Sequence, residues 1–230
     1  MPKSTDMLRG TEEWIDTYTT KNALWIHDGN PKRPHALLTS GKHSNGFFNS
    51  KLVIPDELRL RGAAADLLGL FARQGGNIDT VAGVVGPQTG ATKLAEYMSD
   101  QVNAETRNDC FSVSPAKHAE GEVKSMVFSK EEQELLPGQT ILLCEDVLTT
   151  GGSVNLTAQA VIGAGGTILP FVLVLVNRSG LSHVGDKKII ALIDRLMPLW
   201  TPDECPLCKK GSEAIRPKGT KNWDLLNADY

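Results

Sequence analysis

Short apolar runs alternate with amphipathic segments along most of the chain. Three of the runs have the length and composition of buried strands, at 81–85, 139–144 and 168–176. Around them, apolar positions recur at the spacing of a helix face, over about 56–74, 91–98 and 154–162. Strands that alternate with helices of this length predict an α/β fold, in which helices flank a mostly parallel sheet.

Weaker patterns predict smaller elements around this frame. We expect a first helix from Thr11, as its N-cap, to about Trp25, and we expect Leu58 on the apolar face of the second helix. Residues 114–125 are polar and predict a mobile loop. Short strands are expected on both sides of a polar loop in 36–54, and at 110–113, 126–128 and 188–193.

Composition and charge narrow the class of protein. The chain has 230 residues, of which 40% are hydrophobic and 22% charged, as in one large globular domain with attachments. The net charge of −3 provides no basic field for nucleic acid. No apolar run approaches the ~20 residues of a membrane span, and the first residues lack the apolar core of a signal peptide. We therefore expect a cytoplasmic protein with neither nucleic-acid nor membrane partners.

The segment with the most specific chemistry follows the strand at 139–144. Two adjacent carboxylates, Glu145 and Asp146, precede the sequence TTGGS at 149–153, and a helix follows. A helix N-terminus presents unpaired N–H groups and the positive end of the helix dipole, and glycines let the backbone approach an anion. The hydroxyls suit a phosphate and the acids suit sugar hydroxyls. A plain strand-to-helix turn would not need the two acids, so we expect a sugar-phosphate site.

This segment, LLCEDVLTTGGSV at 142–154, resembles the 5-phosphoribosyl-1-pyrophosphate (PRPP) motif of type I phosphoribosyltransferases. Within that family the chain is most similar to the orotate phosphoribosyltransferases. Weaker resemblances follow in the family's order, and this order makes the combination specific. They are the N-terminal segment SGKHSNGFFN at 40–49, the pyrophosphate loop and helix VVGPQTGATKLA at 84–95, the catalytic loop AKHAEG at 116–121 and the strand end VLVNRSG at 174–180.

The resemblance implies an architecture and a reaction. The fold would be type I phosphoribosyltransferase-like, with a phosphoribosyltransferase domain over 1–200, whose first 55 residues or so form a small hood, and a C-terminal extension over 201–230. The enzyme would join the phosphoribosyl group of PRPP to a nitrogen of a nucleobase, with orotate as the leading base, in pyrimidine nucleotide synthesis. It would form a homodimer and use Mg²⁺ carried by PRPP near Glu145 and Asp146, without direct ligation by the protein.

The resemblance also implies roles for individual residues. Three would be catalytic: Lys117, His118 and Asp146. Four would contact the base: Phe47, Phe48, Thr149 and Arg178. Core packing of Phe48 and an exposed position of Arg178 or Lys117 are the alternatives. PRPP would contact a longer set: Lys42, Gln88, Thr89, Glu145, Asp146, Val147, Leu148, Thr149, Thr150, Gly151, Gly152 and Ser153.

The chain departs from the family pattern at several basic positions. Uncharged residues stand at Thr39, where the family has a lysine, at Gln88 and Thr89, where it has Tyr-Lys or a related pair, and at Val113 and Ser114, where it has Arg-Lys. Each lost charge-assisted hydrogen bond costs about 1.5–3 kcal/mol, unless another lysine substitutes, the candidates being Lys42, Lys93 and Lys124. Two further interpretations stay open: a phosphoribosyltransferase for a different base, and a catalytically weak protein of the same fold that senses PRPP or a nucleotide.

The C-terminal segment contains a CxxC motif that the reaction does not need. Cys205 and Cys208 form half of a zinc site, and the other half is not evident in the sequence. A redox pair and a simply packed turn are the alternatives. The sequence TPDE at 201–204 predicts a capping box with Pro202 at the first helical position. Trp200 and Trp223 are expected to pack this segment onto the domain.

Overall fold

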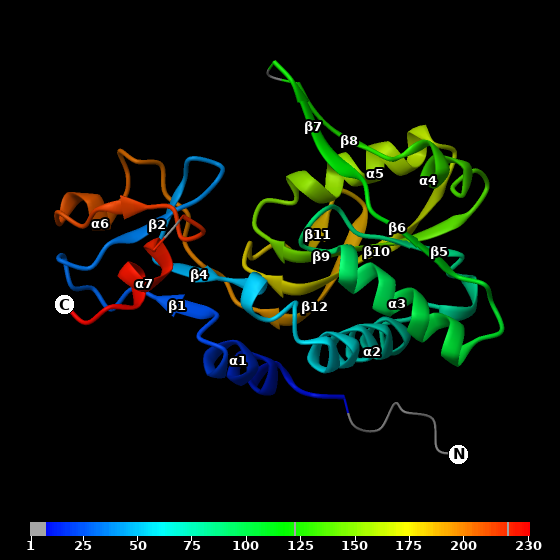
Figure 1. Cartoon of the computed structure of the whole chain (residues 1–230), viewed down its shortest axis with the longest axis horizontal. Helices are drawn as coiled ribbons and strands as arrows, with labels where there is room; N and C mark the ends of the chain where they lie inside the picture. The colour runs from blue at the N-terminus through cyan, green and yellow to red at the C-terminus, as the bar shows by residue number, and fades with distance from the viewer. Residues whose placement is uncertain (1–7, 122, 220) are drawn as a thin grey trace.

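A six-stranded sheet forms the centre of the computed structural model, which describes residues 8–121, 123–219 and 221–230 (Figure 1). The strands run in the order β11-β12-β10-β9-β5-β6, and all neighbouring pairs are parallel except β11 with β12. The mostly parallel sheet predicted by the sequence is confirmed. Its strands are β5 Gly83–Val85, β6 Phe111–Val113, β9 Thr140–Leu148, β10 Thr167–Asn177, β11 His183–Val184 and β12 Lys187–Asp194.

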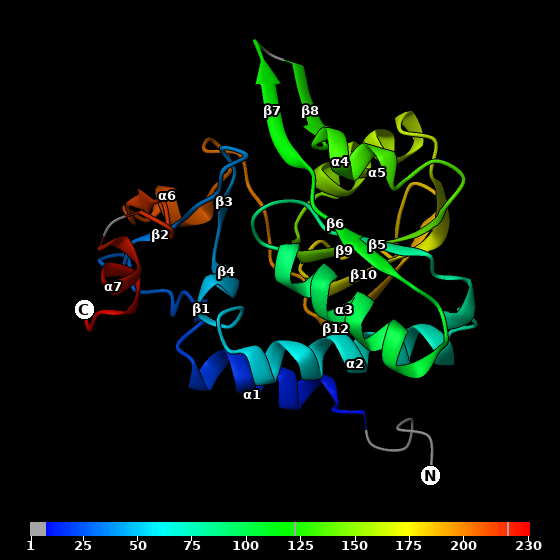
Figure 2. The ribbon, with the colours of Figure 1, turned by 45° about the vertical axis from the view of Figure 1, so that its right-hand side comes forward.

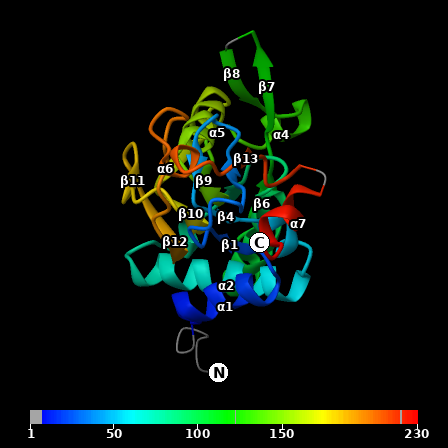
Figure 3. The same ribbon diagram turned by 90° about the vertical axis from the view of Figure 1, so that its left-hand side faces the viewer.

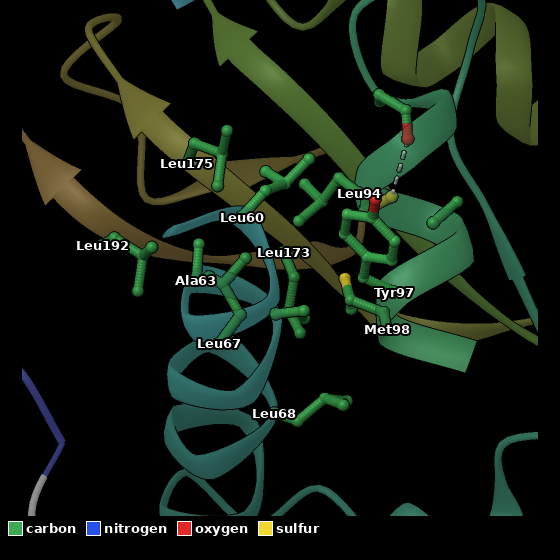
Figure 4. Packing of buried hydrophobic residues seen from close by; sticks show 14 of the residues in the cluster. Leu60, Ala63, Leu67, Leu68, Leu94, Tyr97, Met98, Leu173, Leu175 and Leu192 are labelled. Carbon is green, nitrogen blue, oxygen red and sulfur yellow. Dashed lines mark hydrogen bonds between the residues drawn. The ribbon is translucent and has the colours of Figure 1, made fainter. Parts of the chain in front are cut away.

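Helices cover both faces of this sheet (Figures 1 and 2). One face carries α1 Thr11–Thr20, α2 Glu57–Arg73 and α3 Thr92–Glu105, and the other carries α5 Gly152–Gly163. Each face has its own apolar core. Figure 4 shows the larger one, in which Leu60, Ala63 and Leu67 of α2 lie against Leu173 and Leu175 of β10. A short helix, α4 Lys130–Glu134, and two 3₁₀ turns, Ser50–Leu52 and Ile78–Thr80, complete the connections.

The first helix is shorter than its sequence pattern suggested. Its N-cap is Gly10 rather than Thr11, and it ends at Thr20. Asn22 has a positive φ of 50°, which ends the helical path because the left-handed region is incompatible with a continuing α-helix. Trp25 therefore belongs to a strand, β1 Leu24–Ile26.

The orientation of α2 also corrects one expectation. Asp56 caps the helix, because its side chain accepts a hydrogen bond from the Arg59 amide. The buried face begins at Leu60, and Leu58, two residues earlier, lies on the opposite side of the helix and is 83% exposed. Leu58 therefore contributes nothing to the core.

The segment expected to be an irregular loop forms a two-stranded antiparallel ribbon. Its strands are β7 Ala116–Glu120 and β8 Val123–Val127, joined beyond Gly121, whose φ is +60°. A positive φ suits the tight connections of hairpins, and glycine adopts it without a steric penalty. The ribbon projects from the body of the molecule, as Figure 2 shows. Its mobility stays a prediction.

A smaller region, the hood, lies beside the sheet at the left of Figure 1 and faces the viewer in Figure 3. β1 pairs with β4 Gly46–Phe48, and a second small sheet has the order β13-β2-β3. In that sheet β2 His35–Leu37 forms a hairpin with β3 His43–Ser44 and pairs in parallel with β13 Ala214–Ile215. The N-terminal and C-terminal segments of the chain thus build one structure.

The last helices of the chain differ from the predicted capping box. The helix α6 spans Pro206–Lys209, so Pro206 rather than Pro202 holds the first helical position, and Cys205 is the N-cap. Residues 201–204 form a turn instead. The final helix, α7 Asn222–Asn227, packs on the hood through Trp223, whose indole N–H donates to the Asn22 carbonyl at 3.1 Å. Within the described residues, no helix has the length and apolar character needed to cross a bilayer.

Candidate active site

A cavity of about 430 Å³ lies where β9 and β10 end, between the sheet and the hood. In open α/β sheets, ligands bind at the carboxyl ends of parallel strands, so the position is that of a ligand site. Four parts of the chain line it besides the segment that follows β9. They are the β2–β3 connection with the aromatic pair of β4, the ribbon through Lys117, the end of β10 through Arg178, and the segment Arg216–Gly219.

The loop Thr149–Ser153 forms one wall of the cavity and leads into α5. Gly151, the N-cap, has φ +79°, and a Cβ there would also come within 2.9 Å of Val184. Glycine is required at this position on both counts. The first N–H groups of α5 have no intrahelical acceptor and, with the helix dipole, favour an anion. This is the geometry that the sequence predicts for a phosphate.

Glu145 and Asp146 lie at the end of β9 and both line the cavity. Each carboxylate accepts a backbone N–H: Glu145 from Asp146 at 3.1 Å, and Asp146 from Val147 at 2.8 Å. Burial raises the pKa of Glu145 well above its ordinary value, and the neighbouring Asp146 charge adds to the rise. The ionised form of Glu145 is therefore disfavoured in this position.

The pyrophosphate-loop segment packs directly against Asp146. A Cβ on Gly90 would come within 2.5 Å of the Asp146 Oδ2 atom, so only glycine fits beside this carboxylate. The neighbouring Gln88 is held by the strand end at β6, because its Nε2 donates to the Ser114 carbonyl at 2.8 Å and its backbone N–H donates to Pro115 at 3.0 Å. Neither Gln88 nor Thr89 lines the cavity.

Arg178 is a buried cation at the cavity wall. Its side chain follows β10, and the residue is 1% exposed. Its Nη2 donates to Ser44 Oγ at 2.5 Å, and its Nε has no hydrogen-bond partner among the described residues. No carboxylate of the described chain pairs with it, and burial lowers its pKa to about 10. A buried cation without a counter-ion is costly and favours an anionic ligand.

The aromatic pair of β4 divides between the cavity and the core. Phe48 lines the cavity but is also part of the larger core, where its ring meets the Tyr18 ring edge to face with centroids 5.2 Å apart. Phe47 is half-buried, and its ring lies 6.0 Å from the Trp223 ring and 5.9 Å from the Lys218 Nζ. Phe47 is thus the more available surface for a planar ligand.

The ribbon presents one of its two predicted residues to the cavity. Lys117 lines it, whereas His118 does not. Adjacent residues of a strand point to opposite faces, so His118 lies on the other side of the ribbon. Lys117 pairs with Met126, and Ala119 pairs with Lys124. Lys124 therefore shares the face of Lys117, nearer the tip.

All three lysines proposed as substitutes for missing cations, Lys42, Lys93 and Lys124, lie outside the cavity lining. Lys93 forms an ion pair with Glu96 at 2.6 Å, and Lys42 is exposed on the β2–β3 connection, where Thr39 and Ser40 face the cavity instead. Two cations that were not predicted from the sequence do line the cavity, Arg216 and Lys218. The only signal for them was a basic pair flanking Pro217, in a segment without a recognisable motif.

The CxxC motif lies in the hood, outside this cavity lining. Cys205 and Cys208 face His35 and His43, and the potential ligand atoms of these four residues all lie within 4.8 Å of one another. The partner histidines, which the sequence left unassigned, stand about 170 residues away. The other two cysteines, Cys110 and Cys144, are buried and free.

Comparison with known proteins identifies the protein family to which the chain belongs. The chain matches the family model described as "Phosphoribosyl transferase domain" over residues 58–201, and it therefore belongs to this family of enzymes. The fold agrees: the crystal structure of orotate phosphoribosyltransferase from Aeropyrum pernix superposes with a TM-score of 0.55 at 20% identity, covering 78% of this chain and 92% of that one. The type I phosphoribosyltransferase fold expected from the PRPP motif is confirmed.

Curated relatives point to one branch of the family. The chain is 31% identical over 207 residues to a protein of Desulforamulus reducens named orotate phosphoribosyltransferase, covering 90% of this chain and 95% of that protein. A protein of Heliobacterium modesticaldum with the same name is 33% identical over 186 residues, covering 80% of this chain and 88% of that protein. A relative from Nitratiruptor, also named orotate phosphoribosyltransferase, is 28% identical over 213 residues, covering 86% of this chain and 98% of that protein.

Proposed function

We propose that this enzyme transfers the 5-phosphoribosyl group of PRPP to a ring nitrogen of orotate, forming orotidine 5′-phosphate and pyrophosphate. Orotate is supported as the base by the buried Arg178 at the cavity wall, which has no carboxylate partner among the described residues. Orotate is a planar pyrimidine with a carboxylate, and a guanidinium pairs with a carboxylate through two parallel N–H bonds.

The pocket provides a distinct surface for each part of the two substrates. The ring of Phe47 would lie against the pyrimidine, and Arg178 would bind its carboxylate. The loop Thr149–Ser153 at the start of α5 would hold the 5-phosphate by backbone N–H groups and hydroxyls. Glu145 and Asp146 would accept hydrogen bonds from the ribose hydroxyls, which places the anomeric carbon between these acids and the base.

The reaction is a displacement at that carbon. The bond to pyrophosphate breaks with its electron pair leaving on oxygen, and positive charge develops on the ribose ring. The base nitrogen forms the new bond and gives up its proton to the departing pyrophosphate or to solvent. The nearby carboxylates stabilise the positive charge electrostatically. Lys117, which lines the cavity from the ribbon, would stabilise the negative charge on the departing pyrophosphate.

Mg²⁺ belongs to this proposal as a companion of PRPP. Two adjacent carboxylates at the cavity wall suit a cation that prefers oxygen ligands, and the ion would lie near Glu145 and Asp146 while remaining bound to the substrate. When bound, it neutralises charge on the diphosphate. Burial of Glu145 favours its protonated form, and the approach of a cation would favour its ionisation.

The ribbon is the proposed lid over the reaction. It is a projecting hairpin whose β7 residues are all exposed, and Val123 of β8 is 72% exposed. Closure over bound PRPP would exclude water and prevent its hydrolysis. The exposed apolar side chains of β8 also fit a homodimer in which each ribbon contacts the neighbouring subunit. We further propose a cytoplasmic location, which suits a chain whose four cysteines are all free.

The arrangement of cations favours an enzyme over a sensor. Several basic positions of the family are uncharged here, and Gln88 is held by the Ser114 carbonyl. However, Lys117 of the predicted catalytic loop lines the cavity, and Arg216 and Lys218 bring two further positive charges to it. These can take the place of the missing cations in stabilising a diphosphate.

Comparison of two bases tests the proposal. We expect turnover with PRPP and orotate, and at least a hundredfold lower kcat/KM with uracil, which has the same ring without the carboxylate, because Arg178 then remains buried without an anion. Equal turnover of both bases would contradict the role of Arg178. Turnover of a purine alone would assign the enzyme to another base.

A further inference from the structure

The structure assigns a structural zinc site to the hood, formed by His35, His43, Cys205 and Cys208. The potential ligand atoms of these four side chains lie within 4.8 Å of one another. The two histidines come from neighbouring strands, β2 and β3, while Cys205 is the N-cap of α6 and Cys208 lies within that helix. The half-site of the CxxC motif is thus completed by residues from the other end of the chain.

Four of the six distances within the cluster lie close to those of a tetrahedron around one ion. With zinc bonds of about 2.3 Å to sulfur and about 2.0 Å to nitrogen, sulfur and nitrogen ligands stand about 3.5 Å apart and two nitrogens about 3.3 Å apart. The Cys205 and Cys208 Sγ atoms each lie 3.5 Å from His35 Nε2, and the Cys208 Sγ lies 3.3 Å from His43 Nδ1. The two ring nitrogens lie 3.0 Å apart. Each of these four separations is within about 0.3 Å of the expected value, so small side-chain adjustments would seat an ion.

A hydrogen bond outside the cluster prepares His35 as a ligand. Ser212 Oγ donates its proton to the Arg33 carbonyl at 2.6 Å, so it can only accept from His35 Nδ1, which lies 2.9 Å away. The proton of the neutral imidazole is therefore on Nδ1, and the lone pair on Nε2 points at the two sulfurs. Metal-binding histidines are held in this way by a partner on the other ring nitrogen.

Burial and donor chemistry favour zinc and a structural role. His35 and Cys205 are fully buried and His43 nearly so, while thiols are weak hydrogen-bond partners for buried ring nitrogens. Two sulfurs and two imidazoles in tetrahedral positions are typical of zinc, and four protein ligands leave no open position for a substrate. A redox pair is disfavoured because a disulfide between Cys205 and Cys208 would leave both histidines without a thiol or an ion.

The site would connect the two segments of the hood that reach the active-site cavity. The connection between His35 and His43 carries Thr39 and Ser40 to the cavity lining, and β13, which pairs with β2, leads to Arg216 and Lys218. An ion that ties α6 to both strands would hold these cavity residues in place. This consequence rests on the proposed function, whereas the metal site does not.

Metal analysis of the full-length chain tests the assignment. We expect about one zinc ion per chain by mass spectrometry of the metal content after purification from zinc-supplemented medium. Cys205→Ser and His43→Ala should each lower the content to near zero. Two matched controls, Cys110→Ser and His183→Ala, remove a cysteine and a histidine from elsewhere and should leave it unchanged.

A spectroscopic measurement on the unaltered chain guards against variants that fail to fold. Exchange of zinc for Co²⁺ should produce the intense visible bands of tetrahedral cobalt together with thiolate charge-transfer absorption. A reduced wild-type chain that takes up neither ion, a Cys205–Cys208 disulfide in the purified protein, or zinc retained by Cys205→Ser would each overturn the site. A chain that holds zinc but does not consume orotate would overturn only the proposed function, and the converse result would overturn only the zinc site.

Discussion

Arg178 donates a hydrogen bond from Nη2 to Ser44 Oγ across 134 residues of chain, with a separation of 2.5 Å. Ser44 in turn donates to the Pro198 carbonyl at 2.8 Å, so its lone pairs are directed at the guanidinium. One strand of the hood thereby fixes the orientation of a buried cation that follows a strand of the main sheet. The remaining N–H groups of Arg178 are left for a ligand in the cavity.

Replacement of Arg178 tests its part in base recognition. Arg178→Ala should lower kcat/KM for orotate by about ten- to a hundredfold, because a charge-assisted hydrogen bond contributes about 1.5–3 kcal/mol. PRPP binding, measured by calorimetry, should change little. Arg107→Lys, at an exposed arginine outside the cavity lining, is the control. Unchanged orotate turnover in Arg178→Ala would show that the base binds elsewhere.

Glu145 should make the stability of the free enzyme depend on pH. Its pKa in the folded state lies well above its ordinary value of 4.5, so folding favours the protonated form. The stability that the protonated form contributes is present at low pH and is lost as pH rises through the folded-state pKa. Glu145→Gln removes this loss. We expect its melting temperature to lie closest to that of wild type near pH 5 and to exceed it at pH 8.

The control for this measurement is Glu131→Gln, which changes an exposed glutamate of α4. It should leave the melting temperature unchanged at both pH values. A Glu145→Gln variant that is less stable than wild type at pH 8 would show that the ionised carboxylate is stabilised in the fold, and that the burial argument is wrong. The same variant should lose most of its transferase activity.

The two faces of the ribbon should differ in their effect on turnover. Lys117 lines the cavity and His118 lies on the opposite face, so Lys117→Ala should lower kcat by at least tenfold and His118→Ala by no more than a few-fold. Steady-state kinetics with both substrates saturating measures this. A larger loss in His118→Ala would mean that the ribbon rearranges during closure so that His118 reaches the pyrophosphate.

The cations of the C-terminal segment should guide anionic substrates into the cavity. The double variant R216A/K218A should lower kcat/KM for PRPP several-fold at low ionic strength, because both positive charges face the cavity. Salt screens such attraction, so the difference from wild type should shrink as ionic strength rises. Lys209→Ala with Lys210→Ala removes two exposed lysines at the C-terminal end of α6, outside the cavity lining, and serves as the control. A deficit that is independent of salt would mean that these residues act through packing.

Much of the fold was predictable because its determinants are local. The buried runs of β9 and β10 and the apolar faces of α2, α3 and α5 fix the alternation of strands and helices. The PRPP motif lies within one such unit, so the sequence locates the acids and the phosphate loop together. These residues line the cavity as a group.

The remainder depends on contacts between distant segments, which periodicity does not report. His35 and His43 meet the CxxC motif only because β2 pairs with β13, and Arg216 and Lys218 reach the cavity for the same reason. The strands of the exposed ribbon were also not predictable from the sequence pattern, since β7 and β8 lack the apolar alternation of a half-buried strand. Leu58 was misplaced because the start of a helix, set by its cap, decides which residues face the core.

The most direct test of the whole account is a single coupled assay. Purified protein is mixed with PRPP, Mg²⁺ and orotate, and the loss of orotate absorbance is followed together with the release of pyrophosphate. We expect both to proceed at the same rate, with one pyrophosphate released for each orotate consumed. Tight binding of PRPP by calorimetry without any loss of orotate or release of pyrophosphate would contradict it and identify a protein that binds PRPP without transferring it.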